Sequence, residues 1–305
     1  MSIDLHGIAP LPHLGVIRAA GEQAAEFLQG QLTQDVVLMK PGEARLAGYC
    51  NAKGRLLASF VACKRSPQEF WLVCSRDLLA PTLKKLSMFV LRAKVKLSDA
   101  TDELALHGLI GDAASSIAAG ADQESAGSQK DSEFLAPLPP AGGASRALWI
   151  GPAGSAPPPG HALSPALWDW AAVQSGVATV SAPVIEAFVP QMLNYESVGG
   201  VSFKKGCYPG QEVVARSQFR GAIKRRAFAG QVDGVARAGQ EVFSAAEPDQ
   251  PVGLVAQAAE APQGGTAVIV SIHLAAAQAA DLRVGAADGP ALTGLHLPYP
   301  LLEDI

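Results

Sequence analysis

The sequence is poor in charged and aromatic residues and contains no long hydrophobic run. Charged residues make up 17% and aromatic residues 6% of its 305 residues, whereas 49% are hydrophobic. No apolar run approaches the roughly 20 residues that a membrane-spanning helix needs, and the N-terminal MSIDLHGIAP lacks the basic start and apolar core of a secretory signal. We therefore expect a cytoplasmic protein without a membrane-spanning segment, long enough for two or three packed domains.

Cysteine is also scarce, and the motifs of common metal and nucleotide sites are missing. The four cysteines, Cys50, Cys63, Cys74 and Cys207, are too far apart for a CxxC pair, and three of them lie in strand-like runs. This spacing indicates reduced thiols rather than a disulfide framework or a zinc ribbon. The sequence has no GxxxxGK[ST], HExxH or GxGxxG motif, and its six histidines lack ligand spacing, so we expect no metal site.

The net charge of −4 conceals two local concentrations of positive charge. Residues 201–226 contain seven basic residues and one acidic residue, and residues 84–96 contain five basic residues and no acidic one. Local positive charge of this kind can attract an anionic partner. The first stretch coincides with the most distinctive motif of the chain, whereas we interpret the second as a solvated helix face and strand edge.

The first 110 residues alternate between strand and helix patterns. Two strand-like runs at 45–50 and 55–63, joined by the polar turn Asn51-Ala52-Lys53-Gly54, predict a hairpin. Asp77 is predicted to cap a helix whose leucines recur at helical spacing. The other elements predicted in this part are a helix at 22–30 and strands at 13–18, 69–74, 95–98 and 103–110.

The middle of the chain is rich in glycine, alanine, serine and proline. Residues 120–160 contain few apolar anchors and are predicted to form a variable surface excursion rather than part of a site. Ser164 and Pro165 then provide the N-cap and first-turn proline of a helix that Gly176 closes. From residue 227 onward, short apolar runs separated by glycine, proline and aspartate predict a small antiparallel barrel.

Residues 186–226 carry the densest cluster of chemically distinctive residues. Cys207 precedes the turn pair Pro209-Gly210 and then QEVVAR, which has helical composition. A thiol just before a helix N-terminus and beside two lysines feels a positive potential, which favours its reactive thiolate form. A buried structural cysteine in a tight turn explains the same residues equally well, so the residues alone leave both interpretations open.

The segment FKKGCYPGQEVVAR, with PQMLN upstream and RGAIKRR downstream, resembles the signature K-G-C-[FY]-x-G-Q-E of the YgfZ family of folate-binding proteins. That family is related to the T protein (aminomethyltransferase) of the glycine cleavage system and to a mitochondrial iron–sulphur assembly factor. A weaker resemblance extends over nearly the whole chain and includes AAEFLQGQLTQDV, NAKGRLLASF and WAAVQSGVATV.

The resemblance implies an α+β fold, in which interlaced ferredoxin-like subdomains form a ring with a C-terminal antiparallel β-barrel. It divides the chain into a folate-binding α+β core at 1–222 and a barrel domain at 223–305. Tetrahydrofolate or a folate derivative would bind in the central hole, with Cys207 as the functional thiol. Carried over by motif position, the cofactor-binding residues would be Lys205, Gly206, Tyr208, Gly210, Gln211, Glu212, Arg216, Gln174 and Asn194.

Two positions depart from the T protein pattern. In the T protein, the helix that residues 168–176 resemble ends in Leu-Glu-Ala-Gly, and its carboxylate holds the pterin ring. The matching run here is Val173-Gln174-Ser175-Gly176, and a glutamine offers fewer acceptor sites than a carboxylate. The nearest match to the T protein's catalytic aspartate is Asp77, which lacks the preceding asparagine-rich turn.

Three functions are compatible with these residues. The signature favours a folate-binding accessory protein that supports iron–sulphur enzymes, including enzymes that thiolate tRNA. The second function is a folate-dependent one-carbon transfer like that of the T protein, so whether the protein is an enzyme stays open. The third reads the basic stretches as a nucleic-acid surface. Because residues 201–226 contain only three aromatic residues and the protein is acidic overall, direct nucleic-acid binding is not expected.

Overall fold

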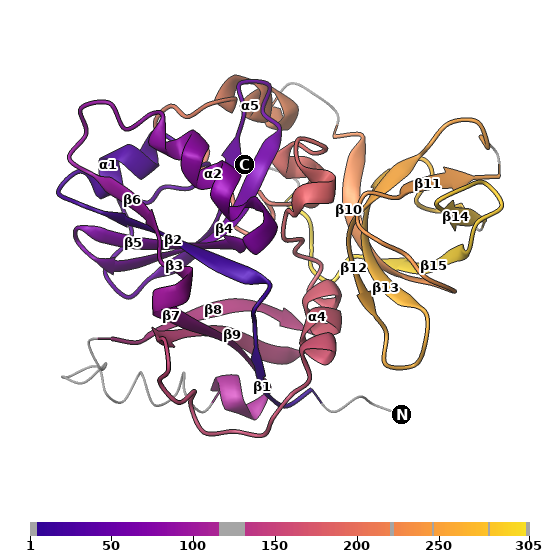
Figure 1. Cartoon of the computed structure of the whole chain (residues 1–305). Coiled ribbons are helices and arrows are strands. Elements are labelled where there is room, and N and C mark those ends of the chain that lie inside the picture. The colour runs from indigo at the N-terminus through magenta and orange to yellow at the C-terminus, as the bar shows by residue number, and fades with distance from the viewer. Residues whose placement is uncertain (1–4, 116–131, 220–222, 246, 280, 303–305) are drawn as a thin grey trace.

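The computed structural model describes residues 5–115, 132–219, 223–245, 247–279 and 281–302. Two antiparallel sheets lie one above the other on one side of the molecule, and a closed barrel lies on the other side (Figure 1). The helix α4 (Pro165–Gln174) lies between the sheets and the barrel. Within the described ranges, no helix is long and apolar enough to cross a membrane.

The first sheet has five strands in the order β3-β4-β5-β2-β6. Its strands are β2 (Leu14–Ala20), β3 (Ala44–Cys50), β4 (Leu56–Ser66), β5 (Glu69–Ser75) and β6 (Lys96–Asp99). The helices α1 (Ala24–Gln29) and α2 (Arg76–Ser87) pack against this sheet over a core of buried aliphatic and aromatic side chains. The hairpin predicted from the sequence is confirmed, because β3 and β4 pair antiparallel around the turn at Asn51–Gly54.

The second sheet has four strands in the order β1-β7-β9-β8. Its strands are β1 (Gly7–Pro10), β7 (Leu104–Ile110), β8 (Phe134–Ala141) and β9 (Ala144–Pro152), and the 3-10 helix η1 (Thr101–Glu103) precedes β7. Apolar residues of the two sheets, among them Trp71, Phe134 and Leu148, meet those of α4 in one continuous core.

The surface excursion predicted at 120–160 is wrong in part, because residues 134–152 form the β8–β9 hairpin of the second sheet. Proline has no N–H to donate, so it is tolerated in a strand at the edge of a sheet. β8 is such an edge, and it places three prolines there while Phe134 and Ala136 are buried. Residues 116–131, which include the first part of the excursion, lie outside the described residues.

The predicted helix at 164–176 is confirmed. The Ser164 side chain accepts a hydrogen bond from the backbone N–H of Leu167, and Pro165 occupies the first turn. Trp168 and Ala171 are buried, and Gly176 follows the helix with a positive φ of 69°. That conformation favours glycine, which is why the helix ends there.

The barrel is closed by six antiparallel strands in the order β10-β13-β12-β11-β14-β15. These strands are β10 (Arg225–Val232), β11 (Glu241–Ser244), β12 (Gly253–Glu260), β13 (Thr266–His273), β14 (Leu282–Val284) and β15 (Ala291–His296). The predicted C-terminal barrel is therefore confirmed. The chain division at 222/223 stays a prediction, because residues 220–222 lie outside the described part.

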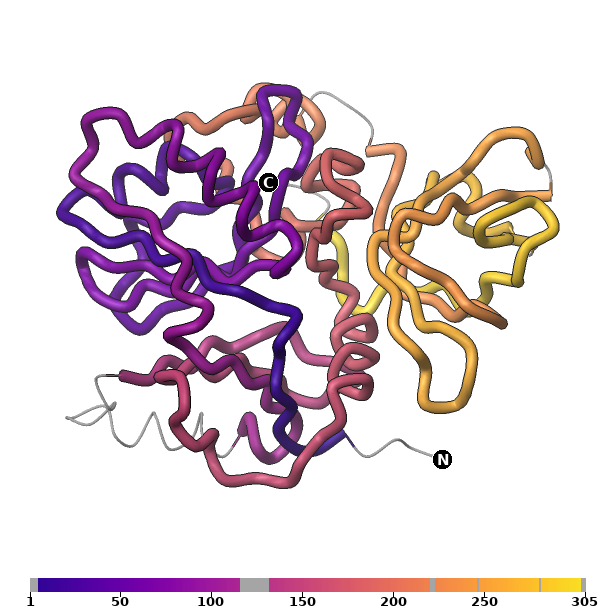
Figure 2. The backbone as a smooth tube through the Cα atoms, viewed as in Figure 1, coloured from indigo at the N-terminus to yellow at the C-terminus, as the bar shows by residue number. Residues whose placement is uncertain are grey.

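The chain crosses between the barrel and the sheets more than once. Between α4 and β10 it forms two 3-10 helices, η2 (Ala182–Val184) and η3 (Pro190–Leu193), and the helix α5 (Gln211–Phe219). After β15 the chain returns from the barrel toward the sheets, as the yellow end of the tube shows (Figure 2). There the Tyr299 hydroxyl donates to the carbonyl of Gly176 over 2.9 Å.

Candidate functional site

The segment Lys205–Arg216 packs against the turn of the β3–β4 hairpin. Gly210 has a positive φ of 79°, and a Cβ atom placed there would lie 2.6 Å from the Cα of Gly54 and closer still to the carbonyl oxygen of Asn51. A Cβ placed on Gly54 would in turn contact Val213 at 3.0 Å. Gly54 and Gly210 belong to distant sequence motifs. Because neither carries a side chain, the two backbone turns can contact each other.

Replacing Gly210 with alanine is expected to lower the free energy of unfolding by about 1–3 kcal/mol, because the new methyl group adds a backbone clash to the strain of a positive φ. Gly199→Ala is the matched control, since Gly199 has a φ of 73° and nothing within 4 Å of its Cβ position. Urea denaturation of both variants measures the difference. Equal losses would show that the contact with the hairpin turn contributes nothing.

Lys205 joins this segment to the end of α1. Its ammonium group donates to the carbonyl oxygens of Gln29 over 2.6 Å and Leu32 over 2.9 Å, and it lies 4.6 Å from the centre of the Tyr208 ring. Burial lowers the pKa of Lys205 to about 8, against the nearby acidic groups of Asp35 and Cys207, which raise it. The cation expected to meet folate is thus engaged with the protein's own carbonyls.

The described cations of residues 201–226 are only partly available to a ligand. Lys205 and Arg226 are buried, and Arg216 pairs with Glu212 on the exposed face of α5. Lys204 and Lys224 are exposed, whereas Arg220 lies outside the described residues. In the second basic stretch the lysines at 84, 85, 94 and 96 are exposed, which confirms the solvated face predicted for it.

Cys207 differs from the other three cysteines in its exposure. Cys50, Cys63 and Cys74 are buried, whereas Cys207 is exposed, so the interpretation as a buried structural cysteine is wrong. Burial raises the pKa of Cys50 and of Cys74 to about 12, and raises that of Cys63 further. A raised pKa suppresses the thiolate, which is the nucleophilic form of a cysteine.

Brief treatment of the native protein with iodoacetamide at pH 7.5 is therefore expected to add one carbamidomethyl group, at Cys207. Cys207 is exposed to the reagent, whereas the other three thiols are buried. Burial also raises the pKa of those three thiols, which suppresses their reactive thiolate form. Mass spectrometry of the intact protein and its peptides measures the result. Cys207→Ser should remain unmodified, and modification of Cys63 under the same conditions would contradict the buried placement.

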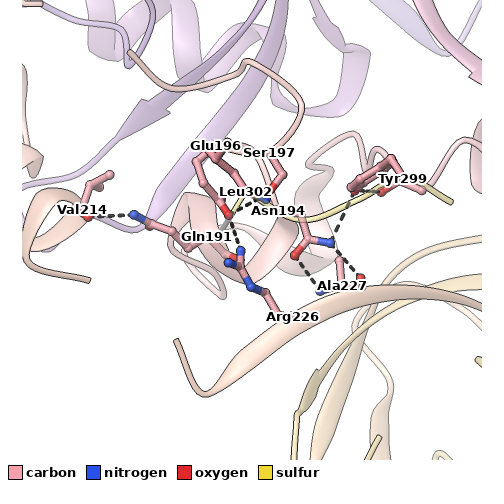
Figure 3. Close-up of polar contacts among 10 residues, drawn as sticks. Gln191, Asn194, Glu196, Ser197, Val214, Arg226, Ala227, Tyr299 and Leu302 are labelled. Atoms are coloured by element: carbon pink, nitrogen blue, oxygen red, sulfur yellow. Dashed lines mark hydrogen bonds and ion pairs between the residues drawn. The ribbon is translucent and has the colours of Figure 1, made fainter. Parts of the chain in front are cut away.

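Asn194 fastens the PQMLN segment to the barrel. It has a positive φ of 57°, its side-chain amide donates to the carbonyl of Ala227 over 2.8 Å, and its side-chain oxygen accepts from the N–H of Ala227 (Figure 3). Gln191 donates similarly to the carbonyl of Val214 in α5 over 2.7 Å. Asn194 is completely buried, so its contacts position the chain.

A buried ion pair lies beside these contacts. Arg226, at the start of β10, contacts the Glu196 carboxylate and also the carbonyl of Gln191, and both charged side chains are almost inaccessible, at 7% and 0% (Figure 3). Ser197 donates to the same carboxylate oxygen and accepts from the N–H of Leu302. The pair thus connects the barrel, the PQMLN segment and the C-terminal tail.

A cavity of about 260 Å³, which we call the central cavity, lies between the two sheets, α4 and β12. Its walls are mostly apolar and include Leu14, Phe60, Val73, Leu148 and Trp168. Polar side chains also line it, and they include His13, Ser59, Arg146, Asp169 and Gln257. A concave site that combines apolar walls with polar groups is typical of a small-molecule site.

The polar groups of the cavity are held in different ways. The Ser59 hydroxyl accepts from the N–H of Val180 over 2.8 Å, and the Gln257 side chain accepts from the N–H of Thr179 over 2.8 Å. Asp169 lies 3.7 Å from His13. Burial raises the pKa of the Asp169 carboxyl, against the opposing charges of His13 and Arg146.

Comparison with known proteins assigns the family. Residues 6–137 match the model of the GCVT N-terminal domain. The chain is 32% identical over 232 residues to the tRNA-modifying protein YgfZ of Colwellia psychrerythraea, covering 72% of this chain and 69% of that protein. It is 30% identical over 241 residues to the YgfZ protein of Shigella boydii, covering 73% and 71%. This chain belongs to the YgfZ family.

The fold of this YgfZ-family chain is that of the aminomethyltransferases. The crystal structure of the glycine cleavage system aminomethyltransferase T from Bartonella henselae superposes with a TM-score of 0.61, at 16% identity, over 88% of this chain and 79% of the other. The fold class expected from the sequence is therefore confirmed.

The YgfZ signature residues and the cavity occupy different places. Among the described residues that line the cavity there is none of the nine predicted to bind folate. Lys205, Tyr208 and Asn194 are buried in contacts of their own. The role of the nine residues in folate binding stays a prediction. Gln211 begins α5, and Gly206 and Glu212 are exposed.

Gln174 lies on the side of α4 away from the cavity. Together with Trp170, one turn earlier, it lines an open groove against the barrel that includes Thr293. Asp169 and Ala172 line the cavity instead. Residues four apart share a helix face, whereas 169 and 172 fall on the opposite face from 170 and 174. The only carboxylate that α4 presents to the cavity is Asp169.

Asp77 does not cap α2, contrary to the sequence prediction. Ser75 is the N-cap residue and donates its hydroxyl to one oxygen of Asp77 over 2.7 Å. The other oxygen accepts from the N–H of Ala182 over 2.9 Å. Asp77 thus joins α2 to the segment that follows α4, and it is not among the described residues that line the cavity.

Two features of this region were not predicted from the sequence. Glu196 and Arg226 are separated by 30 residues, and no motif indicates that their charges meet in the interior. Arg146 lies in a region interpreted as a surface excursion, and only the strand pattern of RALWI could have indicated that its neighbours are buried.

Proposed function

We propose that this YgfZ-family protein binds tetrahydrofolate or a folate derivative in the central cavity and supports iron–sulphur enzymes, including those that thiolate tRNA. Cys207 is its functional thiol. The observation that carries the proposal is the cavity itself, which lies between the sheets, α4 and the barrel of an aminomethyltransferase-like fold. Its relatives' description as tRNA-modifying proteins supports the proposed role in tRNA modification.

The chemistry of a folate fits the cavity walls. A flat pterin ring packs favourably against aromatic and aliphatic side chains, which Phe60, Leu148 and Trp168 provide. Its ring edge carries amide-like donors and acceptors, for which Ser59 and Asp169 are suitable partners. The cytoplasm is the proposed location, because the enzymes that thiolate tRNA work there.

The signature segment supplies the thiol and its support in this proposal. Cys207 is exposed, so it can react with a partner without any rearrangement of the core. Among the described residues no group of three or more His, Cys, Asp or Glu side chains could hold a metal ion. One thiol cannot ligate an iron–sulphur cluster alone, so any cluster on Cys207 requires further ligands from a client or a small thiol.

The accessory role is tested in cells that lack the native gene. We expect the wild-type chain to restore tRNA thiolation and oxidant resistance, and Cys207→Ala to fail while its purified form still binds tetrahydrofolate. Cys63→Ala is the matched control, because it removes a buried thiol from β4. Full restoration by Cys207→Ala would overturn the role of the thiol.

The same purified protein tests the one-carbon alternative. Asp77 uses both carboxylate oxygens in structural hydrogen bonds, so the geometry provides no free aspartate at the position that matches the T protein's catalytic group. We therefore expect binding of tetrahydrofolate without its conversion when a methylamine-loaded carrier protein is added. Turnover of tetrahydrofolate in that mixture would replace the accessory function by catalysis.

A further inference from the structure

Arg146 is a buried cation in the wall of the central cavity. It lies in β9 and is 7% exposed, and its guanidinium carbon lies 4.4 Å from the centre of the Trp168 ring. One long hydrogen bond of 3.4 Å joins Nη1 to the carbonyl of Pro139. The Nε–H is buried without a partner. Most of the donors of this guanidinium are therefore unused.

Two other buried cations among the described residues, Lys205 and Arg226, are engaged by hydrogen bonds or an ion pair, in contrast to Arg146. Lys205 binds two carbonyl oxygens at 2.6 and 2.9 Å, and Arg226 pairs with the Glu196 carboxylate. Within the described part of the chain, Arg146 forms no ion pair. The nearest acidic group of the cavity, Asp169, is paired with His13.

An unpaired charge in the interior is unfavourable, because burial removes the water that stabilised it. Stacking on Trp168 offsets part of this loss and fixes the plane of the guanidinium. Burial lowers the pKa of Arg146 to about 10, so the side chain is still charged at neutral pH. A rigid, charged and unsatisfied guanidinium beside a cavity is what a site for an anionic group requires.

The chemistry of the guanidinium selects the kind of anion. An arginine offers donors only, in a planar fork that matches the two acceptor oxygens of a carboxylate. A pterin edge presents donors as well as acceptors, and its donors suit the acceptors Asp169 and Ser59 rather than Arg146. The cavity thus presents Arg146, which only donates hydrogen bonds, together with groups that can accept them.

We infer that Arg146 binds a carboxylate of the ligand that occupies the central cavity. The inference rests on the proposed function for the identity of that ligand: if the ligand is a folate, the carboxylate belongs to its glutamyl tail. Arg146 then orients the folate from the β8–β9 side of the cavity.

The test compares tetrahydrofolate with tetrahydropteroate, which lacks the glutamyl group, by calorimetric titration. Arg146→Met keeps the aliphatic stem over Trp168 but removes every donor. We expect Arg146→Met to lower the affinity for tetrahydrofolate by about tenfold to a hundredfold, the range of a hydrogen-bonded charged pair. The affinity for tetrahydropteroate should change by less than about threefold. Arg45→Met is the matched control, because Arg45 lies in β3 and pairs with Glu43 outside the cavity; it should change neither affinity.

The outcomes separate this inference from the function on which it rests. If the wild type binds neither compound, the folate proposal is overturned and the glutamyl assignment with it. If the wild type binds both and Arg146→Met weakens both equally, or neither, Arg146 holds no carboxylate. Arg146→Lys keeps a positive charge on the same strand, so it replaces Arg146→Met in the test if that variant does not fold. Its affinity for tetrahydrofolate should fall several-fold, and its affinity for tetrahydropteroate should not.

Discussion

Replacing Arg226 with methionine is expected to lower the free energy of unfolding by about 3–5 kcal/mol, the range seen when one partner of a buried ion pair is removed. The loss arises because Glu196 is completely buried and keeps a charge that neither water nor a cation compensates. A second oxygen of Glu196 already lacks a hydrogen-bond partner. Arg226 is also the second residue of β10, so the same substitution loosens the attachment of the barrel (Figure 3).

Urea denaturation of three variants isolates this effect. Arg216→Met is the matched control, because Arg216 pairs with Glu212 on the solvent side of α5 and exposed pairs contribute less than about 1 kcal/mol. The double variant Arg226→Met with Glu196→Leu removes the unpaired charge and should recover part of the stability. Equal losses for Arg226→Met and Arg216→Met would contradict the buried placement of the pair.

Replacing Lys205 with methionine is expected to cost about 2–4 kcal/mol of stability, because one buried and one partly buried carbonyl oxygen lose a charged donor at once. These carbonyls belong to Gln29 and Leu32, at the C-terminal end of α1, where a helix favours a cation. The substitution therefore separates α1 from the signature segment. The matched control is Lys204→Met, because Lys204 is adjacent to Lys205 in the sequence but is exposed.

The loss at Lys205 should depend on pH in a defined direction. Its pKa is about 8 in the folded protein and 10.5 in the unfolded chain, so between these values only the unfolded chain binds the proton. Stability then rises with pH, because the unfolded state binds more protons. The advantage of the wild type over Lys205→Met should therefore be larger at pH 9.5 than at pH 7. Chemical denaturation at both pH values measures it, and an advantage that shrinks with pH would contradict the lowered pKa.

Local patterns predicted much of the fold. The hairpin turn at Asn51–Gly54, the cap at Ser164 and the glycine-separated strands after residue 227 are all short-range signals, and each appears in the structure where the sequence indicates it. The β8–β9 hairpin was missed because prolines and small residues mark a loop in most sequences. Only its position at the edge of a sheet makes them tolerable in a strand.

The candidate site was less predictable, because it depends on contacts between distant residues. The signature located the exposed thiol of Cys207 and the glycine turn, but no local pattern shows that Lys205 is occupied by the carbonyls of α1. Nor could the helical pattern of 165–174 say which face meets the cavity until the barrel is placed against Trp170 and Gln174. The unsatisfied guanidinium of Arg146 has no signal in the sequence.

The central claim is that a folate occupies the cavity between the sheets, α4 and the barrel. Its most direct test is a titration with tetrahydrofolate of the wild type, Ala172→Phe and Thr293→Phe. Ala172 lines the cavity, whereas Thr293 lines the separate groove that contains Gln174. We expect Ala172→Phe to abolish binding and Thr293→Phe to leave it unchanged. Unchanged binding by a folded Ala172→Phe would contradict the account.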